Sequence, residues 1–153
     1  MRLWRISNHA SLSGEGGLHA SGRWHTRGRR VVYLADYPAS ALLEVMVHLE
    51  IDPEDLPTHY QLLGIDVPED VSVMRLAENE LPDGWRTQIA LTRTRGDEWL
   101  RAGTAALLCI PSVIVPDTTN YVLNPAHSEA ARISTASTLR APFDQRLMAF
   151  LKT

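Results

Sequence analysis

The chain has 153 residues, 44% hydrophobic and 22% charged, with a formal net charge of −3 at pH 7. This length suits one domain spanning residues 1–153, and the small negative charge gives no general attraction for nucleic acid or an anionic membrane. No segment has the apolar length of a signal peptide or a membrane-spanning helix. The single Cys109, in the apolar run ALLCIP, has no partner for a disulfide within the chain. We therefore expect a cytoplasmic protein in which Cys109 is a small buried side chain.

The first 36 residues predict two strands separated by a long loop. LWRIS, residues 3–7, is typical of a short strand, and the β-branched VVYLAD, residues 31–36, predicts a second strand. Residues 8–30 between them are polar and rich in glycine. Loops of this length usually bind a ligand or are disordered, and the embedded Trp24 argues against disorder.

The segment ASALLEVMVHL, residues 39–49, predicts an amphipathic helix that begins near Pro38 and is ended by Pro53. The positions that follow the amphipathic pattern are Ala39, Leu42, Leu43, Met46 and Val47. We expect Leu42, Leu43, Met46 and Val47 to face the core. Glu44 lies among them, and burial of an unpaired carboxylate would be strongly unfavourable. A helix face that lines a cleft would explain this residue, and a surface salt bridge is the alternative.

The remainder of the chain predicts further strands and one long helix. We expect strands at residues 60–68 and 71–76, on both sides of Pro111–Ser112, and in YVLNP and ARISTAST. Residues 85–103 predict a helix with a break near Gly96 and an end at Gly103, and FDQRLMAFL predicts a short closing helix or turn. Because strands and helices do not alternate regularly, the fold class is α+β: a compact single domain with mixed or antiparallel sheets and a few helices.

Common catalytic and binding motifs are missing from the sequence. The histidines and the cysteine form neither H-E-x-x-H nor C-x-x-C, and Glu44 with His48 lacks an evident third ligand, so no metal site is expected. The glycines do not form a phosphate-binding or dinucleotide fingerprint. Ser112 follows a proline and lacks the G-x-S-x-G elbow of serine hydrolases.

Four residues remain that could carry chemistry, although each also has an ordinary structural explanation. Arg23 would otherwise be a solvated loop charge, Tyr33 a core residue and Ser112 a turn residue. Only Glu44, on its apolar helix, is hard to explain structurally.

An ordered series of segments resembles the RES domain family, named for an Arg, a Glu and a Ser. The segments are RLWRIS, SGRWHTRG, VVYLAD, SALLEVMVHL, GDEWL, IPSVIVP, YVLNPAH and FDQRL, and they span nearly the whole chain. The family triad corresponds to Arg23, Glu44 and Ser112, and the family's pocket tyrosine to Tyr33. The chain departs from the family at two positions: Ser21 replaces a common glycine before Gly22, and His25 replaces a common asparagine after the tryptophan.

The resemblance implies a fold similar to ADP-ribosyltransferases and a toxin of a bacterial toxin–antitoxin pair that consumes NAD⁺. Known family members cleave the nicotinamide–ribose bond by hydrolysis or phosphorolysis, or transfer ADP-ribose to a protein. NAD⁺ would be a substrate, and no permanently bound cofactor is expected. The implied partner is an Xre-type helix-turn-helix antitoxin that covers the active site in a hetero-oligomer. DNA would be contacted only indirectly, through the antitoxin. A non-catalytic partner-binding module is the alternative from another class.

The chemistry of NAD⁺ cleavage fits these residue types. A carboxylate such as Glu44 stabilises the cation that develops at the ribose, and a guanidinium such as Arg23 binds a diphosphate through paired hydrogen bonds. Tyr33 could stack on nicotinamide or bond the ribose, and Ser112 could offer a hydroxyl. We also expect Arg5 to line the site and amides near Gly16, Gly17 and Gly22 to bind the diphosphate. Weaker candidates are His25, Asn124 and His127.

Overall fold

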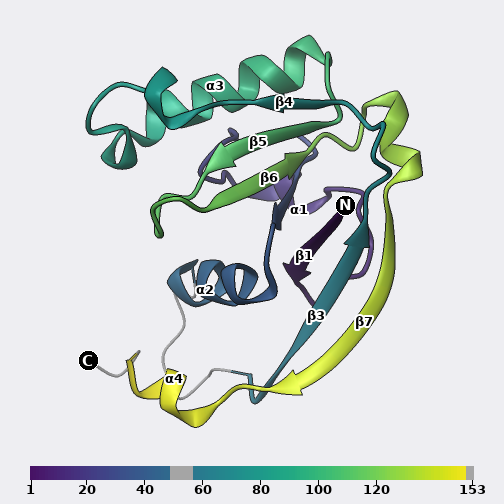
Figure 1. Ribbon diagram of the computed structural model, residues 1–153, viewed down its shortest axis with the longest axis vertical. Helices are drawn as coiled ribbons and strands as arrows, with labels where there is room; N and C mark the ends of the chain where they lie inside the picture. The colour runs from purple at the N-terminus through teal and green to yellow at the C-terminus, as the bar shows by residue number, and fades with distance from the viewer. Residues whose placement is uncertain (49–56, 151–153) are drawn as a thin grey trace.

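In the computed structural model, which describes residues 1–48 and 57–150, the described residues form one seven-stranded sheet with helices packed against it (Figure 1). The strands are β1 (Arg2–Ile6), β2 (Val32–Ala35), β3 (His59–Asp66), β4 (Val73–Arg75), β5 (Leu107–Pro111), β6 (Thr119–Leu123) and β7 (Ser134–Pro142). The helices are α1 (Gly16–His19), α2 (Pro38–His48), α3 (Ile89–Ala102) and α4 (Gln145–Phe150), with short 3₁₀ turns η2 (Glu78–Glu80), η3 (Trp85–Thr87) and η4 (Ser128–Arg132). The predicted α+β class is confirmed. None of the helices in the described residues is long and apolar enough to cross a membrane.

The sheet is mixed and strongly twisted. Its strand order is β4-β5-β6-β2-β1-β3-β7, and only β4 and β5 run parallel among the paired strands of the described residues. In Figure 1, β4, β5 and β6 cross β3 and β7 at a steep angle, with α3 over the first group and α2 beside β1. The predicted strands at residues 60–68 and 71–76 therefore form, but they join opposite regions of the sheet.

Alternating side chains of the strands divide the core between two faces. On one face, Leu3, Val32 and Leu34 join a buried cluster with residues of β3, β5 and β6, which we call the central core. On the other face, a cluster beneath α3 contains three tryptophans, and Tyr33 packs against it. This tryptophan core consists of Trp24, Val31, Leu81, Trp85, Trp99, Leu108, Ile110 and Val122.

Helix α3 contradicts the predicted break at Gly96. The helix is continuous from Ile89 to Ala102, because Gly96 lies on the face that contacts the backbone of Trp24 and needs no side chain there. A Cβ at this position would overlap the Trp24 carbonyl oxygen. The predicted end at Gly103 is confirmed: Gly103 has φ +61 and its N–H donates to the Trp99 carbonyl at 3.1 Å.

The predicted strand after Ser112 is wrong. The Ser112 hydroxyl oxygen accepts the backbone N–H groups of Ile114 and Val115, both at 3.1 Å. These are groups that a strand would use in its ladder, so the serine favours a turn instead. The chain reverses through Asp117, which has φ 57, and the Ser112 N–H then donates to the Thr118 carbonyl at 2.8 Å.

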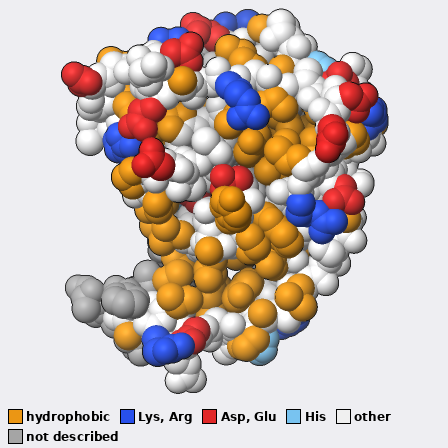
Figure 2. All heavy atoms as spheres, in the orientation of Figure 1, with side chains coloured by type: hydrophobic (Ala, Val, Ile, Leu, Met, Phe, Trp, Pro, Cys, Tyr) orange, Lys and Arg blue, Asp and Glu red, His pale blue; other side chains and the backbone are white. Residues whose placement is uncertain are grey.

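Helix α2 is less buried than its apolar pattern predicts. Ala41 is its one fully buried residue, and Val47 is 57% exposed, so the expectation that Val47 faces the core is wrong. The reason is that α2 packs on β1 and β2 from one side. Figure 2 shows hydrophobic side chains gathered at the surface in this region. Pro53, the predicted end of the helix, lies outside the described residues.

We predict that Gly96→Ala destabilises the protein strongly. The added methyl group must displace either α3 or the backbone at Trp24, and we expect the free energy of unfolding to fall by about 3 kcal/mol or more. Chemical denaturation followed by tryptophan fluorescence measures this change. Gly16→Ala is the matched control, since a Cβ at Gly16 meets nothing within 4 Å. Its effect should stay within about 0.5 kcal/mol, and similar stability of both variants would contradict the close contact.

Candidate active site

Arg23 lies in a loop whose backbone is fixed by side chains of β2 and α3; we call residues 20–30 the arginine loop. Thr92 donates its hydroxyl to the Arg23 carbonyl at 2.6 Å, and the Nε of Arg93 donates to the Gly22 carbonyl at 2.8 Å. From the sheet, the Tyr33 hydroxyl accepts the N–H of Trp24 at 2.9 Å. Both peptide units that flank Arg23 are therefore held in place.

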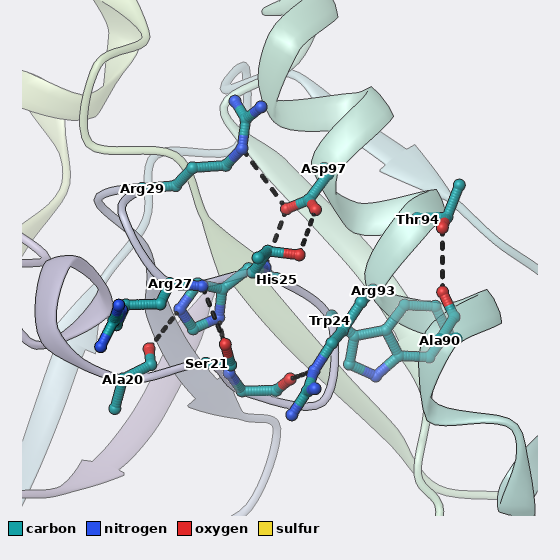
Figure 3. A network of polar contacts seen from close by, with 12 residues as sticks. Ala20, Ser21, Trp24, His25, Arg27, Arg29, Ala90, Arg93, Thr94 and Asp97 are labelled. Atoms are coloured by element: carbon teal, nitrogen blue, oxygen red, sulfur yellow. Dashed lines mark hydrogen bonds and ion pairs between the residues drawn. The ribbon is translucent and has the colours of Figure 1, made fainter.

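A second group of contacts ties the far side of the arginine loop to α3. Asp97 accepts hydrogen bonds from the Thr26 N–H at 2.9 Å and the Thr26 hydroxyl at 2.6 Å, and it lies 3.5 Å from the Nε of Arg29 (Figure 3). Together with the Gly96 contact and the buried Trp99, this explains the GDEWL segment: its residues build the support on which the loop lies.

The guanidinium of Arg23 is half-buried and only partly satisfied. Its Nη2 donates to the carbonyl of Arg86 and, at 3.3 Å, to that of Trp85, whereas its Nε is buried without a hydrogen-bond partner among the described residues. Burial lowers the pKa of Arg23, and the nearby charge of Arg93 lowers it further. Within the described residues neither arginine forms an ion pair with a carboxylate. Two neighbouring cations without a counter-ion favour binding of an anion.

Glu44 is held against the sheet and does not point into open solvent. Its Oε1 accepts a hydrogen bond from the Nδ2 of Asn120 on β6 at 2.8 Å, and its Oε2 lies 3.6 Å from the Nε2 of His48. The Glu44 side chain is 28% exposed, so the carboxylate remains accessible. The 76-residue separation between the partners means that the sheet, rather than the helix alone, orients this acid.

Asn120 is a residue that sequence reasoning missed. It is the register partner of both Ala35 on β2 and Ile110 on β5, so it lies on the same sheet face as Tyr33. Its Oδ1 is buried without a hydrogen-bond partner in the described part of the chain. The sequence signal that could have identified Asn120 is a polar side chain at an inward position of a strand, because a buried polar group usually has a hydrogen-bond partner.

The structure brings most of the expected residues to one face of the sheet. Arg23 borders the tryptophan core through Trp85, and Glu44 borders it through Asn120 and the adjacent Ile110. Arg23 and Glu44 make no direct hydrogen bond or ion pair with each other in the described residues. The Arg23 guanidinium and the Glu44 carboxylate thus lie at the border of the same core, Arg23 beside Trp85 and Glu44 beside Asn120.

Ser112 and Tyr33 are on this face as well, but their hydroxyls are engaged. Ser112 is 3% exposed and continues the alternation of Leu108 and Ile110 at the end of β5; its oxygen accepts two backbone N–H groups. The Tyr33 hydroxyl bonds to Trp24 and lies 2.8 Å from the Nδ1 of His25. Burial raises the pKa of Tyr33, so this hydroxyl stays protonated.

Arg5 is not brought to the other candidates. It alternates with Trp4, the register partner of Ala35, and so shares the opposite face of the sheet with Leu3 of the central core. Its guanidinium donates to the Ser11 carbonyl at 3.3 Å, and burial lowers its pKa.

The remaining candidates form turns or loop contacts. Asn124 accepts the N–H of Ala126, and His127 accepts that of Glu129, both at 3.1 Å. The amide of Gly17 donates to the Gly14 carbonyl, and the amide of Gly22 donates to His25. These two glycine amides are therefore engaged within the loop. They allow close packing instead, since a Cβ on Gly22 would overlap the Tyr33 hydroxyl.

Comparison with known proteins shows the family and the fold of the chain. The family model described as "RES domain" matches residues 2–144. The Toxin Res of Pseudomonas putida (strain KT2440) is 55% identical over 85% of this chain and 88% of its own length, and the Prs ADP-ribosylating toxin of Sphingobium sp. (strain YBL2) is 36% identical over 95% and 96%. The crystal structure of the Mycobacterium tuberculosis MbcT–MbcA toxin–antitoxin complex contains a chain with the same fold, with a TM-score of 0.71 and 19% identity over 99% of this chain and 88% of that one. The chain belongs to the RES domain family.

Proposed function

We propose that this RES domain protein is the toxin of a bacterial toxin–antitoxin pair and consumes NAD⁺ by cleaving its nicotinamide–ribose bond. One observation carries the proposal: Arg23 and its neighbour Arg93 have no carboxylate partner among the described residues, and Arg23 borders the same core as an accessible, sheet-anchored Glu44. NAD⁺ has matching features, an anionic diphosphate at one end and, at the other, a ribose that becomes cationic as nicotinamide leaves.

Glu44 would act on the ribose. Loss of nicotinamide leaves an oxocarbenium-like centre, and a carboxylate held close to it lowers the barrier because the stabilisation is greatest in the transition state. The hydrogen bond from Asn120 fixes one carboxylate oxygen and leaves lone pairs of the other for a ribose hydroxyl or an incoming acceptor. Asn120 is therefore assigned as a positioning residue for Glu44.

The two arginines would bind the diphosphate. The Nε of Arg23, which has no hydrogen-bond partner in the part of the chain that the structure describes, supplies a donor, and Arg93 adds positive potential. Both lie in a partly desolvated place, where charge-assisted hydrogen bonds are strongest. The Ser112 hydroxyl accepts two backbone donors, so its proton is left for an acceptor on the substrate. The ring of Tyr33 lies beneath the arginine loop and supports it.

The acceptor of ADP-ribose is a separate question. Water or phosphate as acceptor would make the protein an NAD⁺ glycohydrolase or phosphorylase. Transfer to a protein is the second candidate, and it is favoured by the similarity to a relative that is named a Prs ADP-ribosylating toxin. The bond broken and the role of Glu44 are the same in all these reactions.

The proposed partner is an antitoxin of the helix-turn-helix, Xre-type class that covers the active site. Support comes from the fold shared with a chain of the MbcT–MbcA toxin–antitoxin complex and from the apolar surface at α2, where Val47 is exposed beside the helix turn that carries Glu44. DNA would be contacted through the antitoxin alone, in a hetero-oligomer. The substrate and this partner both suit a cytoplasmic location.

We predict that Glu44→Gln abolishes NAD⁺ consumption while it preserves the fold. The amide keeps the shape of the side chain and its contact with Asn120 but removes the charge that stabilises the ribosyl cation, so the rate should fall about 100-fold or more. The measurement is nicotinamide release from NAD⁺ by the purified protein, together with cellular NAD⁺ after induction. Glu98→Gln, the same change on an exposed position of α3, is the matched control. Equal loss of NAD⁺ by both variants would remove Glu44 from the mechanism, and no loss by the wild type would favour a non-catalytic binding module.

We predict that Arg23→Lys weakens NAD⁺ binding about tenfold or more, because lysine keeps the charge but lacks the planar fork. Calorimetric titration of NAD⁺ in the Glu44→Gln background measures binding without turnover. Arg95→Lys on the exposed surface of α3 is the control and should bind as the parent does. An unchanged dissociation constant for Arg23→Lys would argue against a diphosphate at this position.

Labelled NAD⁺ separates the acceptors. NAD⁺ carrying the label on its adenylate group should yield a small labelled product if water or phosphate is the acceptor, and the phosphate reaction should require added phosphate. Label retained on a protein in a cell extract, and absent with Glu44→Gln, would instead identify a protein ADP-ribosyltransferase. We expect the small product to predominate. A predominantly protein-bound label would instead make protein ADP-ribosylation the favoured reaction.

A further inference from the structure

His25 is a buried residue of the arginine loop itself, and it contacts Gly22 at the other end of the turn that carries Arg23. It is 3% exposed, and Gly22 and His25 form a small antiparallel bridge around Arg23 and Trp24. The Nδ1 of His25 lies 3.2 Å from the donating N–H of Gly22 and 2.8 Å from the hydroxyl of Tyr33. The Nε2 lies 2.9 Å from the carbonyl oxygen of Ala20 (Figure 3).

These partners determine which ring nitrogen carries the proton. The Ala20 carbonyl can only accept, so Nε2 must carry a hydrogen, and in neutral imidazole Nδ1 is then an acceptor. Nδ1 in turn accepts the hydrogen of the Tyr33 hydroxyl, whose oxygen accepts the N–H of Trp24. A directed chain of hydrogen bonds runs from Trp24 through Tyr33 to His25, and each group in it has one compatible role.

We propose that His25, acting through Tyr33, is a positioning residue for Arg23, and that protonation of His25 releases the arginine loop and weakens binding of the anionic substrate. The link to substrate rests on the proposed function, whereas the link to the loop rests on the contacts of His25 alone.

Protonation is incompatible with the observed contacts. An imidazolium has a hydrogen on Nδ1, which would point at the donating N–H of Gly22 and force the Tyr33 oxygen to accept two hydrogens. The Tyr33 hydroxyl would then need a new acceptor in a buried place. Protonation therefore removes Nδ1 as an acceptor: the Gly22 N–H keeps only the His25 carbonyl, at 3.1 Å, and the hydrogen of the Tyr33 hydroxyl loses its acceptor. Because the Tyr33 oxygen holds the N–H of Trp24, both neighbours of Arg23 are disturbed together.

The charged groups around His25 come from two elements. The phenol of Tyr33 on β2 stays protonated, whereas Asp97 and Arg93 on α3 act in opposite directions: the carboxylate raises the pKa of His25 and the guanidinium lowers it. Burial is the largest effect and lowers the pKa of His25 below its ordinary value of 6.5, against the smaller opposing effects of the Ala20 and Gly17 carbonyls. At neutral pH His25 is therefore uncharged, as the hydrogen bonds require.

The direction of the pH effect follows from this lowered pKa. Below pH 6.5 the unfolded chain binds a proton at His25 before the folded chain does, so the contribution of His25 to stability falls as the pH decreases. Binding that requires the ordered loop falls in the same range. The contribution is fully present above that pH.

The first test examines the loop without substrate. Nuclear magnetic resonance of labelled wild-type protein should show the backbone N–H signals of Gly22 and Trp24 shifting with pH together with the ring nitrogens of His25. In His25→Asn the side-chain oxygen takes the place of Nδ1 as acceptor but does not titrate, so those two amide signals should stay constant. Amide signals that ignore the titration of His25 in the wild type would overturn the proposal.

The second test measures NAD⁺ binding in the Glu44→Gln background. Between about pH 7.5 and about pH 5.5 the dissociation constant should rise about fivefold or more with His25 and change less than about twofold with His25→Asn. Tyr33→Phe, which removes the link, should bind weakly at both pH values. His48→Gln controls for the histidine beside residue 44 and should keep the pH response.

The outcomes of the two tests distinguish the positioning role of His25 from the proposed function. A pH response retained in His25→Asn, or lost in His48→Gln alone, would overturn the role of His25 in binding. If the parent protein does not bind NAD⁺ at any pH, the proposed function fails, and the positioning role is then decided by the amide signals of Gly22 and Trp24.

Discussion

The contact between helix α3 and the backbone of Trp24 is the constraint on which the site depends. Gly96 allows the helix to lie directly on this peptide, and Thr92 and Arg93, one turn earlier, then reach the peptide groups around Arg23. Any residue with a side chain at position 96 would displace the helix or the backbone at Trp24, and so would disturb these hydrogen bonds together. Close packing and hydrogen bonding are therefore one requirement here, and the position of the Arg23 guanidinium is set by packing some distance from its own charge.

A rigid loop allows the protein to keep an unfavourable arrangement of charge. Arg23 and Arg93 repel each other in a partly desolvated place, and within the described residues no carboxylate neutralises them. Free side chains would separate to relieve the repulsion, but Arg93 is held by the Gly22 carbonyl and Arg23 by the carbonyls beside Trp85. Backbone carbonyl groups, which are dipoles, partly satisfy both cations. An anionic ligand would complete the arrangement and stabilise the folded state by binding it selectively.

Periodicity predicted the elements of this fold well where one face of a segment is buried. The strands around Tyr33 and Cys109 and the helix end at Gly103 follow from local rules. Two errors had different causes. Gly96 resembles a helix breaker, but it serves a tertiary contact with Trp24, a residue 72 positions away. The run after Ser112 resembles a strand, but the serine hydroxyl accepts two backbone N–H groups only two and three residues further along the chain, which is a local side-chain effect that apolar periodicity does not show.

The candidate site could be predicted in part. Local oddities and the family resemblance indicate Arg23, Glu44 and Ser112, and the structure places all three on one face of the sheet, while their roles stay predictions. Asn120 was missed because its importance comes from a hydrogen bond across the sheet to Glu44, which no local pattern encodes. Arg5 failed to join the others because a strand sends alternate residues to opposite faces, and the sequence alone did not fix which face of β1 meets the site.

Arg23 and Glu44, the two charged residues of the candidate site, lie on different kinds of structural element. This difference affects how a partner protein could control the site. Arg23 lies in a loop fixed by β2 and α3, whereas Glu44 lies on a helix that packs on one side and leaves apolar groups such as Val47 at the surface. The bond from Asn120 is then the main link that keeps Glu44 in register with the sheet. A protein that covered the apolar surface of α2 would bury hydrophobic area and act on the helix that carries the acid. It could block the site without touching the arginine loop, so recognition of the partner and binding of the anion would use separate parts of the fold.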